Sequence, residues 1–99
     1  MEVLYEEPGA FIGLSWEDNL KVWMIHLHCT EWSPSEFKRQ IKVWEMLRID
    51  LRARGITEVY GLAADAKAVK FNKMFGATTT GHVVEDEDGN LNALIKMET

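Results

Sequence analysis

The sequence predicts an α+β domain, built as a mixed β-sheet of five to six strands with two helices. Two observations lead to this fold class. Short apolar segments alternate with turn residues, as is typical of strands. Two other segments begin with a capping residue and repeat apolar residues at helical spacing. The 99 residues suffice for one hydrophobic core but not for two, so a single domain spans residues 1–99.

The first third of the chain is predicted to form three consecutive strands. Residues 3–6 form the first strand, which ends at Pro8-Gly9 because this pair interrupts regular structure. Residues 10–17 form the second strand, with alternate apolar side chains on one face. After the turn at Asp18-Asn19, residues 20–29 form the third strand. Both of its faces are apolar, so we expect this strand at the centre of the sheet.

A long helix over residues 34–54 has the clearest local signal. Ser33 and Glu36 form a capping box, and Pro34 occupies the first helical position. Gly55 supplies the C-terminal stop. Between these ends the apolar residues recur at helical spacing: Phe37, Ile41, Trp44, Leu47 and Leu51.

The second half of the chain alternates between strand and helix and ends in a hairpin. Residues 56–63 are β-branched and apolar, as expected for a buried strand. Asp65 caps a second helix over residues 66–75. Residues 77–85 and 91–97 form two strands joined by a short acidic turn. The element order is therefore β-β-β-α-β-α-β-β, with a right-handed parallel crossover across the long helix.

Composition narrows the classes of function. The net charge of −5 opposes binding to nucleic acid or to an anionic membrane. No apolar run approaches the roughly 20 residues that span a bilayer, and the N-terminus is acidic where a signal peptide is basic. The single cysteine, Cys29, excludes an internal disulfide and fits a reducing compartment. We therefore expect a soluble cytoplasmic protein with no nucleic-acid or membrane partner.

Three segments, together with the element order, resemble the GNAT superfamily of N-acetyltransferases. They are residues 22–28, 55–61 and 65–77, and the last is similar to the family's Asn-x-x-Ala-x-x-x-Tyr-x-x-x-Gly-Phe helix. In this alignment Asp65 takes the capping position and Gly76 the helix-ending glycine. The likeness is strongest to GNAT-like proteins of bacteriophages. It implies a shortened domain that lacks the family's N-terminal strand and its two acceptor-binding helices, with acetyl-CoA as cofactor if the protein is enzymatic.

Two departures from the family pattern oppose catalysis. The family binds the cofactor's pyrophosphate with Arg/Gln-x-x-Gly-x-Gly/Ala at the start of the long helix, where free backbone N–H groups face the anion. The corresponding residues 31–36 contain no glycine, Pro34 has no N–H, and Glu36 already places a carboxylate at the cap. The family's general-acid tyrosine aligns with Asn72, whose amide cannot supply a proton at neutral pH.

The resemblance also implies candidate site residues. His26 and His28 share one face of the third strand, and either imidazole can act as a general base. Glu31, just after that strand, is a candidate base for an amine. The candidate cofactor contacts are Leu27, Cys29, Ser35, Lys38, Arg39 and Asn72.

Each candidate also has a purely structural interpretation. His26 and His28 form a His-x-His pattern, but no third ligand lies at a recognisable spacing, so no metal site is predicted. Both rings can instead fill the polar end of a sheet face. Cys29 is expected to be a small buried thiol rather than a nucleophile. The basic stripe of the long helix can dock an acidic partner or can be a solvated surface.

Three functions remain open at this point. The first is a non-catalytic phage-type protein that acts in virion structure or binds a host protein, in the host cytoplasm or the virion. The second is a small acyl-CoA-dependent N-acetyltransferase acting on an amine or a protein lysine. The third is an interaction domain of cellular origin. We also expect a homodimer, because two helices would leave Ile12, Leu14 and Trp16 on one side of the sheet and Phe11 on the other uncovered.

Overall fold

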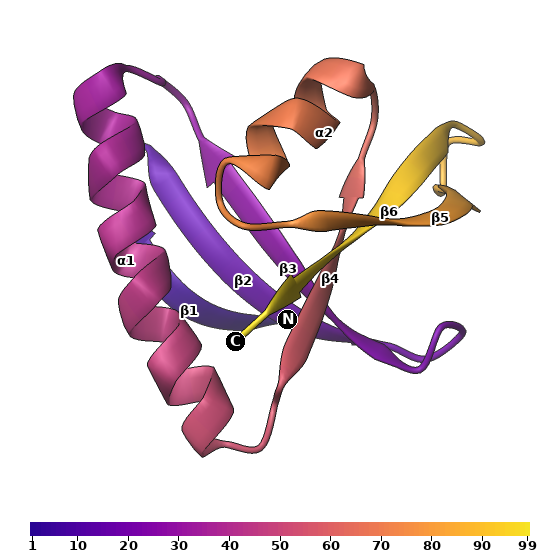
Figure 1. The fold of residues 1–99 in the computed structure, drawn as a ribbon, viewed down its shortest axis with the longest axis horizontal. Helices are drawn as coiled ribbons and strands as arrows, with labels where there is room; N and C mark the ends of the chain where they lie inside the picture. The colour runs from indigo at the N-terminus through magenta and orange to yellow at the C-terminus, as the bar shows by residue number, and fades with distance from the viewer.

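The computed structural model describes all 99 residues and contains one six-stranded sheet with two helices (Figure 1). The strands are β1 (Glu2–Glu7), β2 (Ala10–Glu17), β3 (Val22–Cys29), β4 (Glu58–Ala63), β5 (Thr78–Glu85) and β6 (Leu91–Glu98). The helices are α1 (Pro34–Ala53) and α2 (Ala66–Lys73). The predicted fold class and element order are confirmed, and each predicted boundary lies within two residues of the observed one.

The sheet is mixed, with the order β1-β2-β3-β4-β6-β5. β2 and β3 pair antiparallel along their whole length, from Ala10 opposite Cys29 to Glu17 opposite Val22. β3 and β4 are parallel and central, but a single pair, Met24 with Tyr60, joins them. Because the ladder stops there, β3 and β4 diverge toward their C-terminal ends. This divergence creates the site described below.

The ends of α1 follow the local chemistry of the sequence. The Ser33 hydroxyl accepts a hydrogen bond from the backbone N–H of Glu36 at 3.1 Å, which completes the N-cap. At the other end Gly55 adopts a φ of 83°, a conformation that ordinary side chains rarely tolerate. The start of β3 differs from the prediction by two residues: Lys21 has a φ of 57°, so the turn extends to Lys21 and the strand begins at Val22.

Both helices pack on the same face of the sheet. The core joins Trp44 and Leu51 of α1 to Val59 of β4 and Ile95 of β6. Val69 of α2 packs against the same cluster. Because both helices lie on this face, the opposite face of the sheet carries no helix. Neither helix is long and apolar enough to cross a membrane.

The expectation that Ile12 and Leu14 remain uncovered is wrong. Their exposed fractions are 3% and 1%, because α1 lies over this part of the sheet and Leu14 joins the core with Trp44. Trp16 does remain 49% exposed. Its ring meets that of Trp23 edge-on, with centroids 5.2 Å apart.

Candidate functional site

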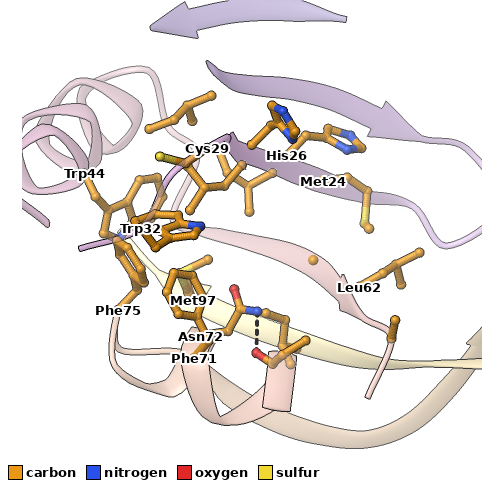
Figure 2. A pocket seen from close by; sticks show the side chains of 18 residues that line it. Met24, His26, Cys29, Trp32, Trp44, Leu62, Phe71, Asn72, Phe75 and Met97 are labelled. Carbon is orange, nitrogen blue, oxygen red and sulfur yellow. Dashed lines mark hydrogen bonds between the residues drawn. The ribbon is translucent and has the colours of Figure 1, made fainter. Parts of the chain in front are cut away.

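The diverging ends of β3 and β4 open a cleft of about 520 Å³ that runs between the strands toward α1 and α2 (Figure 2). Because β3 and β4 separate, the cleft reaches side chains from both faces of the sheet: His26 and His28 from one face, Trp44 from the other. Fourteen of its 18 lining residues are hydrophobic, and none is lysine, arginine, aspartate or glutamate.

An aromatic group forms one wall of the cleft. The Trp32 ring lies edge-on to Phe71 with centroids 4.7 Å apart, and Phe71 lies 5.3 Å from Phe75. Phe37 of α1 joins this group, 5.1 Å from Phe75. Figure 2 shows Trp32, Phe71 and Phe75 gathered on one side of the cleft. The sequence predictions did not include these rings in the site, although the spacing of four between Phe71 and Phe75 places both on one side of a helix.

His26 lies across the cleft from these rings. Its Nε2 lies 2.8 Å from the Ser15 hydroxyl on the neighbouring strand. Burial, with a smaller contribution from the N-terminal ammonium group, lowers the pKa of His26 below its usual 6.5. The ring is therefore neutral at pH 7, the form that can accept a proton. His28 also lines the cleft but is exposed. No group of three potential metal ligands comes together in the structure.

Three of the proposed cofactor contacts also line the cleft: Leu27, Cys29 and Asn72. The Asn72 side-chain N–H₂ donates to the backbone carbonyl of Ala68 at 2.7 Å, so one of its donors is used within α2 (Figure 2). The Cys29 thiol donates to the backbone carbonyl of Glu31 at 3.2 Å.

The other four sequence candidates, Glu31, Ser35, Lys38 and Arg39, do not line the cleft. Arg39 is committed to an ion-pair group at the start of α1. Its guanidinium donates to both Glu7 and Glu36, and the Arg39–Glu36 pair measures 2.8 Å. These hydrogen bonds raise the pKa of Arg39, Glu7 contributing most.

The first turn of α1 has few donors left for an anion. Pro34 has no N–H, and the N–H of Glu36 is bound by the Ser33 hydroxyl. The Glu36 carboxylate accepts from Arg39 and also from the Gln40 amide at 2.9 Å. These two hydrogen bonds lower the pKa of Glu36, and the one from Arg39 contributes most. The carboxylate is therefore charged at neutral pH. Glu7 and Glu36 thus place two carboxylates against the single guanidinium of Arg39, and this group at the start of the helix carries an excess of negative charge.

The solved structures that this chain resembles include one described as the crystal structure of aminoglycoside 6'-acetyltransferase type Ii, with a TM-score of 0.66 and 16% sequence identity. The match covers 97% of this chain and 66% of that chain, so this chain spans just under two thirds of the length of the protein it matches. No family model matches the sequence. No curated protein sequence matches it either. At this level of identity the likeness shows the fold alone, and that fold is GNAT-like.

Proposed function

We propose that this GNAT-like domain is a binding protein with a degenerate acetyl-CoA site rather than an acetyltransferase. The observation that carries the proposal is the first turn of α1, where the charged Glu36 carboxylate stands at the helix N-terminus. A helix N-terminus holds phosphate when its N–H groups are free and no other anion competes. Here Glu36 already benefits from the helix dipole, so a pyrophosphate would meet repulsion instead.

The charges around the cleft support the same proposal. The Arg39 guanidinium, which stands one turn into α1, is neutralised by the two carboxylates of Glu7 and Glu36. The cleft itself is lined by no cation that could replace it. At the position of the family's general acid, Asn72 offers only an amide. Both the binding of a phosphorylated cofactor and proton delivery to a leaving thiolate are therefore disfavoured.

The finer role that we propose is that of a phage-type protein, acting in virion structure or binding a host protein, in the host cytoplasm or the virion. It rests on the resemblance of the sequence as a whole to GNAT-like phage proteins and on the loss of cofactor chemistry just described. Homodimerisation belongs to the same proposal, because one face of the sheet carries no helix.

A small acyl-CoA-dependent N-acetyltransferase is the second candidate. The GNAT-like fold and the neutral His26 at the cleft favour it, since His26 could take a proton from an acceptor amine. In that case the leaving thiolate would take its proton from water or from another residue. Asn72→Ala should then leave turnover almost unchanged, and a loss of two orders of magnitude would show that Asn72 takes part in the reaction.

The proposed function is tested by removing the charge at the helix start. Glu36→Gln keeps the shape of the side chain and abolishes its charge, so affinity for acetyl-CoA should rise about tenfold, or about 1.4 kcal/mol. The matched control is Glu45→Gln, on the same helix and away from the first turn, which should leave binding unchanged. Equal affinities in wild type, Glu36→Gln and Glu45→Gln would contradict the proposal.

A further inference from the structure

We propose that the cleft between β3 and β4 holds an extended, uncharged, mainly apolar peptide segment of a protein partner. This inference rests on the proposed function and names the chemistry of the partner. Three features of the cleft lead to it: unpaired strand backbone, an apolar lining of suitable size, and the absence of Lys, Arg, Asp and Glu from that lining.

The first feature is the backbone that the diverging strands leave unpaired. Beyond the Met24–Tyr60 pair, no ladder connects Ile25–Cys29 of β3 to Gly61–Ala63 of β4. Backbone N–H and C=O groups that are removed from water need partners, and leaving one without a partner costs about as much as losing a hydrogen bond. A ligand that supplies amide donors and acceptors at strand spacing would satisfy them, as in peptide binding by strand addition. A hydrocarbon chain would leave them unpaired.

The second feature is the size and apolar character of the cleft. Its volume of about 520 Å³ lies within the roughly 300–1,000 Å³ typical of sites for small ligands. Apolar side chains of a peptide would meet the rings of Trp32, Phe71 and Phe75 on one side and Leu27 on the other. Aromatic walls of this kind provide much contact area with little loss of side-chain freedom.

The third feature is charge. No cation lines the cleft, so an acidic side chain would be buried there without a partner. Charges of both signs lie around the cleft, Glu31 and Glu36 on one side and Lys70 and Lys73 of α2 on the other, so they favour neither sign of partner. An uncharged segment fits this uncharged lining best.

Binding can be tested with short blocked peptides and NMR of the ¹⁵N-labelled protein, a method suited to weak complexes. The probe is the N-acetylated, C-amidated tripeptide leucyl-leucyl-phenylalanine. It should shift the amide signals of residues 25–29 and 61–63 in a saturable way. The same peptide with glutamate at its centre should bind at least about tenfold more weakly. Decanol tests the hydrocarbon alternative, and saturable binding of decanol without binding of the peptide would overturn the inference.

Three variants, one of them a control, locate the binding. Ala64 is exposed and lines the cleft, so Ala64→Trp should fill it and weaken peptide binding at least about tenfold. Ala66→Trp is the matched control, because Ala66 is also exposed and lies outside the cleft. Leu62→Lys places a cation in the cleft and should reverse the preference, so that the glutamate peptide binds better than the neutral one. Unchanged peptide binding in Ala64→Trp would overturn the inference.

These outcomes separate the inference from the proposed function. Failure of the neutral peptide to shift the cleft signals, with acetyl-CoA also failing to bind, would overturn the inference and leave the binding-protein proposal standing. Micromolar binding of acetyl-CoA would overturn the proposed function, and with it the peptide assignment, because the cofactor would then be the occupant of the cleft.

Discussion

The Glu36 side chain determines whether the N-terminus of α1 can bind an external anion. Its carboxylate accepts from Arg39 and Gln40 and stands where a helix N-terminus would otherwise attract an anion. Gln40 is fully buried, and its amide N–H₂ is used by Glu36 and Glu7, while its carbonyl oxygen has no partner. The Gln40 amide beneath α1 therefore donates to carboxylates of the protein itself, those of Glu7 and Glu36.

His26 makes stability depend on pH in a defined direction. Burial lowers its pKa in the folded state below the usual 6.5, so the folded form binds a proton less readily than the unfolded chain. The stabilisation from the neutral ring is complete above about pH 6.5 and is lost as the pH falls through this range toward the folded-state value. We therefore predict that the free energy of unfolding falls between pH 7 and 5, and that His26→Gln flattens this fall.

Urea denaturation at a series of pH values measures this effect. His28→Gln is the matched control, since His28 is exposed on the same strand face. If both variants kept the full pH dependence of the wild type, His26 would not be its source.

Part of the candidate cleft is lined by residues that the sequence analysis had named. His26, Leu27 and Cys29 were predicted from the third strand and do line the cleft. Arg39 was expected near a cofactor, but it pairs with Glu7, which is 32 positions away along the chain. Local spacing cannot show an ion pair that forms only after α1 packs across β1.

The ends of α1 are determined by residues that lie close to them in the sequence. Ser33 provides the one side-chain cap, by accepting from the N–H of Glu36. We predict that Ser33→Ala lowers the free energy of unfolding by about 1 kcal/mol, the usual cost of losing such a cap. Ser35→Ala removes a hydroxyl that lies 3.2 Å from that of Ser33 but leaves the cap bond to Glu36 in place, so it should change stability by less than about 0.5 kcal/mol. Chemical denaturation compares the two variants, and equal losses would show that Ser33 is not the stabilising cap.

Element boundaries were predictable because they depend on local chemistry. Caps, proline at the first helical position and glycine with positive φ act within a few residues of each other. The starts of β3 and β4 and the end of α2 each differ from the prediction by two residues. At β3 the cause is local, but nothing in a lysine indicates the φ of 57° at Lys21. Strand order is different: the separation of β3 from β4 after Met24 depends on pairing along the whole sheet, and the sequence analysis did not predict it.

The whole molecule has one helix-covered face and one face without helices. The latter includes Phe11, Val22 and Tyr60, all of which are partly exposed, and Leu62, which is 40% exposed. We predict a homodimer at tens of micromolar, because a second copy would shield this face from water. Sedimentation equilibrium measures the mass directly. A monomer mass across this concentration range would contradict the prediction and show that a largely uncovered sheet face is tolerated.

The central claim, that this GNAT-like fold does not bind acetyl-CoA as an enzyme would, is tested most directly by calorimetric titration of the purified protein with acetyl-CoA. The charge of Glu36 and the absence of cations in the cleft predict a dissociation constant of about 1 mM or weaker, a binding free energy of only about −4 kcal/mol. A dissociation constant in the low micromolar range would contradict the claim and support the acetyltransferase instead.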